Sequence, residues 1–416
     1  MTSSTHHGMP RLAVVGLIWL IVVDLLPRVT VGPYTVSALF TLLTAMWCLA
    51  FLPLVGFRGG NSPHDGIQLE SSGKAVPAVL LLFLALAWIS LAFNSSSDGL
   101  QNVAVFTTFI AGAAVVSLQA APDQVDKVLS FYRPAALLVT VVFLASTVAG
   151  VELYGPRSFA LSCIVLVAIF VPYRGRHLLY AVAPLLVVMA AFLSLSRMAS
   201  VICAALLVFL AVRIRQRSLR IPLAGIFAGL GALLIYWAIM FYEPFRDRFL
   251  GGDAAVSVGG QNFNTSGRTE LWRVTVESAA KAPWWGQGPG TADAQVYAAF
   301  APISHPHNEY LRLYHDFGLI GLTLFVVGFV LLTLRVWARA RQTDQEIHWV
   351  ALSGLLGVAV AALTDNVLVY PFVMAPLGVL VGCSLAQPLR PRRLEEDGVA
   401  LGVGDQTPSS PKRASL

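Results

Sequence analysis

Charged side chains are scarce in this chain. They make up 12% of its 416 residues, whereas 56% are hydrophobic and the mean hydropathy is +0.72. A soluble protein of this length needs more polar side chains to cover its surface. Apolar stretches of about 18 or more residues recur along nearly the whole sequence, and about 20 such residues in a helix span a bilayer core. The sequence therefore predicts an all-α, polytopic integral membrane protein.

The chain also lacks the motifs of several chemistries. No Walker, GxGxxG, HExxH, GxSxG or DxD motif is placed to act, and "GQGPG" has no strand before it, so the use of ATP or a nucleotide sugar is not indicated. The net charge of +6 is spread over loops, which argues against nucleic acid as a partner. The four cysteines lie in apolar runs without CxxC or CxxH spacing, which favours small buried side chains over disulfides or metal ligands: Cys48, Cys163, Cys203 and Cys383.

Hydropathy predicts twelve membrane spans, with ten or eleven as alternatives because some segments are short or tightly linked. Spans 1–9 fall within residues 1–241 and spans 10–12 within 317–387, separated by a long loop at 242–316. The tail at 388–416 is rich in Pro, Ser and charge and is expected to be disordered. The expected spans are 11–27, 34–56, 75–93, 99–120, 134–152, 158–173, 177–195, 197–213, 219–241, 317–338, 347–365 and 369–387.

The distribution of Lys and Arg predicts the orientation. With the N-terminus in the cytoplasm, most of the 28 Lys and Arg residues fall on the inner side, and the outer loops other than 242–316 are nearly bare. Both termini are therefore expected in the cytoplasm and the long loop outside. A loop of this length is usually functional.

Two segments of the long loop carry helix-start signals. "TSGRTELWRVTVESAAKA" opens with a Thr/Ser cap, and "SHPHNEYLRLYHDFG" opens with Ser304 ahead of Pro306 in the expected first turn. Between them, "PWWGQGPGT" predicts a Gly/Pro turn, with Trp284 and Trp285 at the membrane interface.

Three histidines gather in the second of these segments. In a helix begun there, His307, Tyr310 and Tyr314 share one face with Leu311. His307 is the candidate for proton transfer, because only histidine has an unperturbed pKa suited to it near neutral pH. Asn308, Tyr310 and Tyr314 are expected to support it.

The same histidines do not predict a metal site. His305 and His307 form a pair without a third ligand, and His315 is too far along the helix to bind the same ion as His307. His305 and His315 are interpreted as loop residues near the lipid headgroups.

Two arginines at the outer surface are candidate phosphate ligands. Arg197 in "SLSRMAS" stands between two apolar runs, where a lone charge is costly; snorkelling to lipid phosphate is the structural alternative. Arg268 in "TSGRTELW" stands at an expected helix start, where backbone N–H groups add to a guanidinium in binding phosphate. Two arginines beside a histidine suggest a diphosphate next to a general base.

Asp365 is a third candidate. It lies in "ALTDNVLVYP", at the outer end of the eleventh expected span. It can pair with an arginine or orient the histidine. The alternative is a turn-forming role with Asn366 ahead of Pro371.

The motifs resemble those of the bacterial O-antigen ligases, in the O-antigen ligase and polymerase superfamily. The resemblance lies in His307 and Asn308 followed by Gly318 and Gly321, in "SRMAS" and "SGRTELW", and in the glycine-rich "WWGQGPG". Leu322 departs from the pattern, since many ligases have a second glycine there. The first 190 residues carry no motif of this kind.

The resemblance implies a fold, a reaction and its partners. The fold is a GT-C-like helical membrane glycosyltransferase. The donor is O-antigen on undecaprenyl diphosphate, and the acceptor is the lipid A–core oligosaccharide at the periplasmic face of a Gram-negative inner membrane. No metal or other cofactor takes part, and membrane lipids surround the enzyme. His307 acts as general base in an inverting displacement, and Arg197 and Arg268 hold the diphosphate.

Other functions remain open from the sequence. An O-antigen polymerase uses the same donor, and a protein O-oligosaccharyltransferase shares related motifs but has a large C-terminal domain. A transporter also fits twelve spans with both ends inside. Against a transporter, the sequence has no repeated halves, and its polar residues gather at one face rather than at the midplane.

Overall fold

The computed structural model is helical over the residues it describes. These are residues 10–56, 76–212 and 267–387, with gaps at 23–24, 26–28, 32–33, 171 and 174–176, two strands between 256 and 263, and isolated residues between 229 and 243. The principal helices are α1 (Arg11–Val22), α2 (Val36–Gly56), α3 (Ala78–Phe93), α4 (Ser97–Gln119), α5 (Pro122–Val148), α6 (Pro156–Phe170), α7 (Leu178–Leu193), α8 (Arg197–Val212), α11 (Arg268–Ala279), α12 (Thr291–Phe300), α13 (Glu309–Thr343), α14 (Glu346–Ala361) and α15 (Pro371–Ala386), with the 3-10 turn η3 at Val367–Val369.

Strands are minor among the described residues. β1 (Thr30–Val31) pairs antiparallel with β2 (Tyr34–Thr35), and β3 (Val256–Val258) pairs antiparallel with β4 (Gln261–Phe263). Each pair has a short register, Thr30 opposite Thr35 in the first and Val256 opposite Phe263 in the second. The predicted all-α class is therefore confirmed.

Several helices are candidate membrane spans. Within the described residues, α4, α5, α13 and the Val36–Pro53 part of α2 are long and apolar enough to cross a membrane. The other apolar helices are shorter, at 10–17 residues. The expected span at 219–241 lies largely outside the described residues, as does the tail at 388–416. A membrane protein with several apolar helices is what the structure supports, and the count of twelve stays a prediction.

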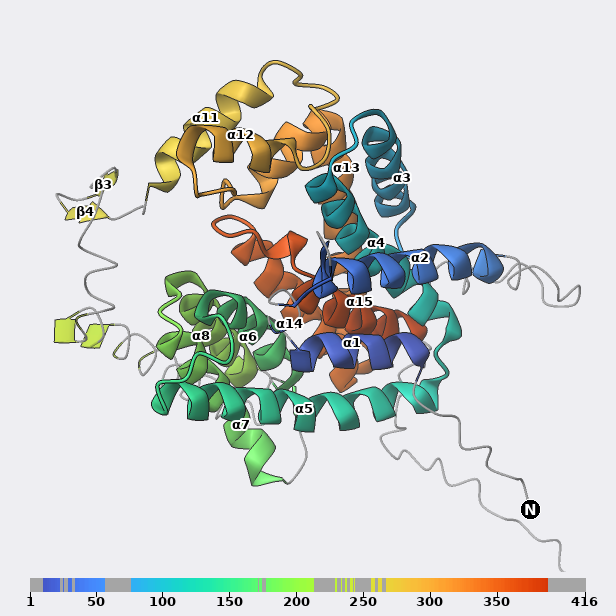
Figure 1. Ribbon diagram of the computed structural model, residues 1–416. Coiled ribbons are helices and arrows are strands. Elements are labelled where there is room, and N and C mark those ends of the chain that lie inside the picture. The colour runs from blue at the N-terminus through green and yellow to red at the C-terminus, as the bar shows by residue number, and fades with distance from the viewer. Residues whose placement is uncertain are drawn as a thin grey trace, which may run out of the picture.

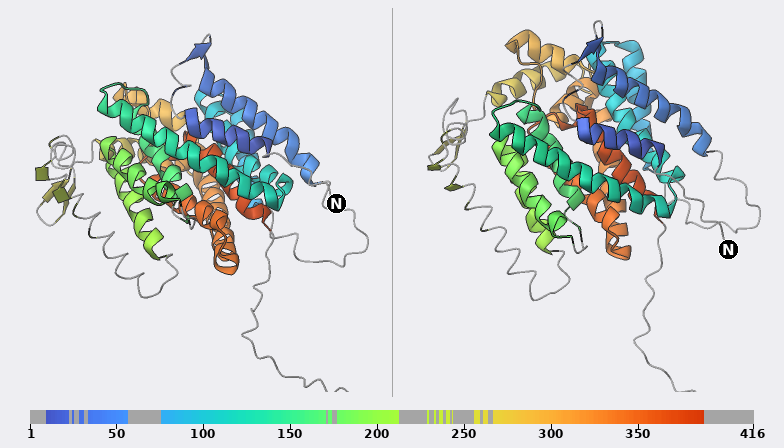
Figure 2. Two further views of the ribbon diagram at one scale, coloured as in Figure 1. Left: turned by 90° about the horizontal axis from the view of Figure 1, so that it is seen from below. Right: turned by 60° about the horizontal axis from the view of Figure 1, so that its bottom comes forward.

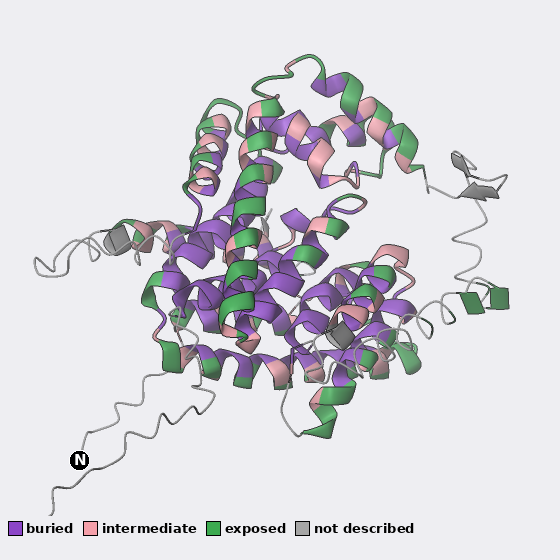
Figure 3. Ribbon diagram, turned by 180° about the vertical axis from the view of Figure 1, so that it is seen from behind, coloured by how far each residue is buried: buried purple, intermediate pink, exposed green. Residues whose placement is uncertain are grey.

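The centre of the molecule is formed by α4 and α15, in which nearly every residue is buried (Figure 3). α15 lies directly on α4, with α1 against α15 and α2 against α4 (Figure 1). Two glycines of α15 allow this approach: a Cβ at Gly378 would lie 3.0 Å from the Phe109 carbonyl oxygen, and one at Gly382 2.7 Å from that of Ala113. Small residues at a crossing let helices pack closely in a lipid environment, where apolar burial alone gives no net attraction.

The longer α5 runs along one side of the bundle, next to α1 and α7 (Figure 2). α6, α7 and α8 pack together beside α14. The four cysteines are buried and unpaired, as the sequence predicted.

α11 and α12 lie at one end of the molecule, over the start of α13 (Figure 1). α13 is broken at Gly318, whose φ of 67° and ψ of −172° are not helical. The glycine-rich turn packs against this break: a Cβ at Gly318 would lie 2.2 Å from the Trp284 carbonyl oxygen, and one at Gly286 2.4 Å from the Asp316 carbonyl. Four main-chain hydrogen bonds join the two segments, from Gln287 N to His315 O, Gly288 N to Asp316 O, Leu319 N to Pro283 O and Ile320 N to Trp284 O.

Aromatic rings fix α13 on both sides of the break. Phe83 of α3 lies 5.4 Å from Phe317 and 5.2 Å from Phe325, centroid to centroid, in edge-on arrangements. Such pairs add specific geometry to the apolar area they bury. Trp284 and Trp285 remain exposed, and their place at the membrane interface stays a prediction.

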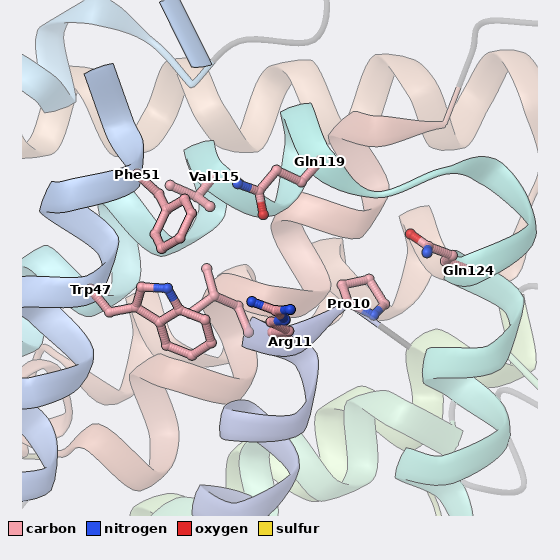
Figure 4. A pocket seen from close by; sticks show the side chains of 8 residues that line it. Pro10, Arg11, Trp47, Phe51, Val115, Gln119 and Gln124 are labelled. Carbon is pink, nitrogen blue, oxygen red and sulfur yellow. The ribbon is translucent and has the colours of Figure 1, made fainter. Parts of the chain in front are cut away.

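A cavity of about 350 Å³ lies at the other end of α4, away from α11 and α12 (Figure 4). It lies among the starts of α1 and α5 and the ends of α2 and α4. Its lining is Pro10, Arg11, Leu12, Trp47, Phe51, Val115, Gln119 and Gln124.

Candidate active site

His307 lies just before α13, not within it. The helix begins at Glu309, and its cap is Asn308, whose Oδ1 accepts a hydrogen bond from Leu311 N at 3.1 Å. The expected helix start at Ser304 is therefore wrong, and so is the helical face that was to join His307 to Tyr310 and Tyr314. The physical reason is that Asn308 caps as well as a serine does, and Pro306 lies ahead of that cap.

The backbone of His307 is in a left-handed conformation, with φ 54°. Residues other than glycine adopt it rarely, and it persists where the surroundings hold it in place. Here Trp272 Nε1 of α11 donates to the Pro306 carbonyl at 2.9 Å, and Glu309 N donates to the Ala362 carbonyl at 2.8 Å. His307 is thus fixed between α11 and the end of α14.

The His307 ring contacts three polar side chains. Its Nδ1 bonds Asn366 Oδ1 and lies 3.8 Å from Asp365 Oδ1. Arg157 Nη2 lies 3.0 Å from Nδ1 and 3.4 Å from Nε2, and it also donates to Asp365 Oδ1 at 2.9 Å. Asp365 therefore pairs with an arginine beside the histidine, and it also accepts from Asn366 N at 3.0 Å within its own turn. Asp365 thus makes both the arginine contact and the turn contact that the sequence left as alternatives, and its part in a function stays a prediction.

The surroundings keep His307 neutral. Burial and then the positive charge of Arg157 lower the pKa of His307 from 6.5 to about 4, against the raising effect of Asn366 and Asp365. A neutral imidazole has one N–H and one lone pair. Asn366 Oδ1, which can only accept, and Arg157 Nη2, which can only donate, both contact Nδ1, so the two contacts favour opposite tautomers of the His307 ring.

Three arginines stand at the beginnings of helices. Arg197 is the first residue of α8, Arg268 the first of α11, and Arg157 the second of α6. A cation is unfavourable there, because the helix dipole puts partial positive charge at the same end. The same dipole and the free N–H groups favour a bound anion.

These arginines act on one another. The pKa of Arg268 is lowered by burial and by the charges of Arg157 and Arg197, while the charge of Asp365 raises it. Arg268 also lowers the pKa of His307. The site thus combines three guanidinium groups, one carboxylate and a neutral imidazole, a set suited to a ligand with more than one negative charge. We call Arg157, Arg197, Arg268, His307 and Asp365 the open cluster.

The remaining predicted residues lie nearby with structural contacts. The Tyr310 hydroxyl donates to the Ala359 carbonyl at 2.9 Å and so ties α13 to α14. Tyr314 is partly exposed on α13. α11 begins after Gly267, in a left-handed conformation without a side-chain cap, so the expected Thr/Ser cap is wrong. Thr265 and Ser266 lie outside the described residues.

A second charged group lies within α13, in the interior. Arg312 Nε donates to Glu309 Oε2 at 2.7 Å, and both side chains are almost fully buried. His315 is 1% exposed and its Nε2 lies 3.1 Å from Ser278 Oγ, so its interpretation as a headgroup-facing residue is wrong. Asp316 accepts from Gly290 N and Ala292 N at the start of α12, at 2.9 Å each. We call Glu309, Arg312, His315 and Asp316 the buried cluster.

His305 lies next to the open cluster, with its ring centroid 6.3 Å from that of His307. Its Nδ1 lies 2.9 Å from Asp293 Oδ1 of α12, and its side chain is one-third exposed. Among the described residues, no group of three or more His, Cys, Asp or Glu side chains is arranged to hold a metal ion.

Arg157 and Asn366 are the site residues that sequence reasoning missed. Arg157 carries the same signal as Arg197, an arginine between two apolar runs at the outer surface, directly after Pro156. In the sequence, only the position of Asn366 directly after Asp365 indicates that it could belong to the site. Its contact with His307 depends on a turn between α14 and α15 that no local pattern predicts.

The described residues thus form an all-helical chain with several apolar candidate spans, as in a membrane protein, in which a histidine and several arginines come together. A family model described as O-antigen ligase matches residues 182–326, a range that includes Arg197, Arg268 and His307. The match confirms the resemblance to the O-antigen ligase superfamily and supports a ligase- or polymerase-type function in general. Arg157 and Asp365 lie outside the matched range. No curated protein matches the chain.

Proposed function

We propose that this protein is an O-antigen ligase. It transfers O-antigen polysaccharide from undecaprenyl diphosphate to a sugar hydroxyl of the lipid A–core oligosaccharide. The observation that carries the proposal is the open cluster: a neutral His307 beside three arginines placed at helix starts. A lipid diphosphate supplies the anion that such arginines bind, and a sugar hydroxyl supplies the proton that the imidazole accepts.

The reaction is a single displacement with inversion. The unprotonated ring nitrogen of His307 takes the proton from the acceptor hydroxyl while the hydroxyl oxygen forms a bond to the anomeric carbon of the donor glycan. The bond between that carbon and the diphosphate oxygen breaks, and its electron pair leaves with undecaprenyl diphosphate. The imidazolium then returns its proton to solvent. A positioned base of this kind contributes about 10²–10⁴-fold.

Arg197 and Arg268 bind the diphosphate as it gains charge. Fixed donors aimed at developing charge are worth about 10²–10³-fold each. Because the diphosphate is a good leaving group, the displacement does not depend on a strong general acid. Asn308, Tyr310 and Asp365 hold the base and its neighbours in place, and Tyr314 lies on the adjoining surface of α13.

The proposed location is the Gram-negative inner membrane, with the open cluster at the periplasmic face and both termini in the cytoplasm. In a variant without the four cysteines, Tyr297→Cys on α12 should react with an impermeant thiol reagent in intact spheroplasts. Asp126→Cys, near Lys127 on α5, is the matched control and should react only after lysis. The reverse pattern would invert the orientation.

In vitro transfer tests the function directly. Purified protein in nanodiscs is mixed with undecaprenyl diphosphate-linked O-antigen and lipid A–core, without nucleotide and with EDTA. We expect the glycan on lipid A–core, and no product with His307→Ala. Growth of the lipid-linked glycan without lipid A–core would instead assign a polymerase. Loss of activity in EDTA with recovery on adding zinc would contradict the metal-independent mechanism.

A further inference from the structure

Two side chains beside His307 come from one short turn that follows α14. Asp365 and Asn366 lie next to each other within residues 362–368, and both are almost fully buried. Asn366 Oδ1 contacts Nδ1 of the His307 ring, and Asp365 Oδ1 lies 3.8 Å from the same atom. The position of the 362–368 turn therefore decides where these two partners of the ring stand.

Glu309, two residues after His307, bonds both ends of this turn. Its main-chain N–H donates to the Ala362 carbonyl at 2.8 Å. Its side-chain Oε1 accepts from Leu368 N at 3.2 Å. One residue at the start of α13 thus holds the turn on each side of the two residues that lie beside the histidine.

The other carboxylate oxygen of Glu309 is held by Arg312, almost one helical turn further along α13. Arg312 Nε donates to Glu309 Oε2 at 2.7 Å, and the two side chains form an almost fully buried ion pair. A buried carboxylate needs such a partner, and hydrogen bonds to an ionised group are about twice as strong as neutral ones. With Oε2 fixed in this way, Oε1 is left for the turn.

The short distance along the chain between His307 and Glu309 gives this contact its meaning. A buried N–H such as that of Leu368 needs an acceptor in any fold. Here the acceptor comes from the residue that is only two peptide units from the ring. The stretch that carries the ring therefore also carries the groups that place its partners, so the ring and the turn share one point of attachment.

We propose that Glu309 is a positioning residue for His307. Its N–H and its carboxylate hold the 362–368 turn at a fixed place relative to the ring, so that Asp365 and Asn366 meet the imidazole in one geometry. The effect on transfer rests on the proposed function, whereas the placement of the turn is measured without turnover. A catalytic group misplaced by about 1 Å loses on the order of 10²-fold in rate.

Two double variants separate the contact with the turn from the ion pair. The first, Glu309→Gln with Arg312→Leu, removes both charges and keeps an amide oxygen that accepts from Leu368 N. The second, Glu309→Leu with Arg312→Leu, removes both charges and the acceptor. Each leaves one buried donor unpaired, the amide NH2 in the first and Leu368 N in the second, so similar melting temperatures are expected.

NMR of ¹⁵N-labelled histidine in nanodiscs at pH 7 reports the placement of the turn. The Asn366 contact favours the proton on Nδ1 of His307, and the Arg157 contact favours it on Nε2. Loss of the Asn366 contact in the second double variant should therefore shift His307 toward the tautomer protonated on Nε2. The first double variant should keep the spectrum of the unaltered protein. An unchanged His307 signal in the second double variant would overturn the proposal.

Ser278→Ala is the matched control for a general loss of stability. Ser278 Oγ lies 3.1 Å from His315 Nε2 in the buried cluster, and it makes no contact that holds the 362–368 turn. The melting temperature should fall in this variant, while the His307 signal stays as it is. A shift as large as that of the second double variant would show that loosened packing moves the ring, and it would count against a specific role of Glu309.

Transfer from undecaprenyl diphosphate-linked O-antigen to lipid A–core gives the second measurement. We expect kcat to be about 10²-fold lower in the second double variant than in the first. KM for the donor should change less, because Arg197 and Arg268 are the proposed donor ligands. Equal kcat in the two variants would remove the role of Glu309 while leaving the ligase proposal intact. A shifted His307 signal without transfer by the unaltered protein would instead remove the ligase proposal and support the placement of the turn by Glu309.

Discussion

The open cluster and the buried cluster differ in how their charges are balanced. In the buried cluster, Arg312 and Glu309 face each other with almost no exposure, and Asp316 is used up in capping α12. Among the described groups of the open cluster, three arginines gather near the Asp365 carboxylate. The charge pairs of the buried cluster serve the fold, and the gathered cations of the open cluster are, under the proposed function, where the ligand binds. The two clusters meet at the start of α13, where His307 is followed by Glu309 and Arg312, yet they should respond differently to mutation.

The largest expected effect is at His307. His307→Ala should reduce transfer by about 10²–10⁴-fold while leaving expression and thermal stability unchanged, because the variant lacks the proposed base. Initial rates on purified lipid-linked donor measure the loss. His315→Ala is the matched comparison from the buried cluster, and it should lower the melting temperature instead. If the two variants exchanged these effects, the division between the clusters would fail.

Substitution of Arg312 should lower the stability of the protein, in contrast to substitution of His307, which should lower its activity. Arg312→Leu leaves Glu309 buried without its partner, and breaking such a pair costs about 3–5 kcal/mol. The expected result is a clear drop in the melting temperature of the protein in detergent. The double variant Glu309→Gln, Arg312→Leu removes the stranded charge and should recover part of the loss. A double variant as unstable as the single one would mean that packing against Phe106, 5.7 Å below the guanidinium, matters more than charge.

The next largest effect is expected from substitution of Arg197 or Arg268. Arg→Ala at either should lower donor binding and transfer by about 10²-fold, the worth of one fixed charge-stabilising donor. Arg→Lys should recover only part of it, because an ammonium cannot form the two parallel bonds. Binding of undecaprenyl diphosphate, followed by calorimetry, is the measurement. Unchanged affinity in both alanine variants would make these arginines structural or lipid-facing.

The smallest effect is expected at Asn308, which stands between the clusters. Asn308→Ala removes the cap of α13 and should cost about 1 kcal/mol of stability. Asn308→Asp keeps the cap and should be nearly neutral in a melting experiment. The rate of transfer should fall only slightly, by an amount that depends on how far loss of the Asn308 cap moves the His307 ring. A loss as large as that of His307→Ala would place Asn308 in the chemistry itself.

The sequence predicts the helical class well, because apolar length is a local property that the bilayer enforces. It also marks Arg197 and Arg268 as candidates, since a charge between apolar runs or at a helix start stands out; both begin helices, and their role stays a prediction. It misplaces the start of α13, where Ser304 and Asn308 are both good caps and only the contacts of Pro306 and Glu309 decide between them. It misses Arg157, because nothing local tells which outer arginine faces the histidine.

The burial of His315 was also beyond the sequence. It accompanies the break at Gly318, where the glycine-rich turn covers that part of α13. A pattern of residues shows that a glycine is present, but not which backbone passes over it. Long-range contacts of this kind follow from the packing of the whole chain.

The main-chain bonds around Gly318 also bear on how such a protein can change over evolutionary time. Main-chain atoms are the same in every residue, so the turn at 283–290 holds the start of α13 whatever side chains α11 and α12 display on their exposed surfaces. Those surfaces can change in sequence while the backbone at residues 315–320 stays where it is. Under the proposed function, such a backbone contact lets the surface that meets the glycan vary without moving the helix that follows His307.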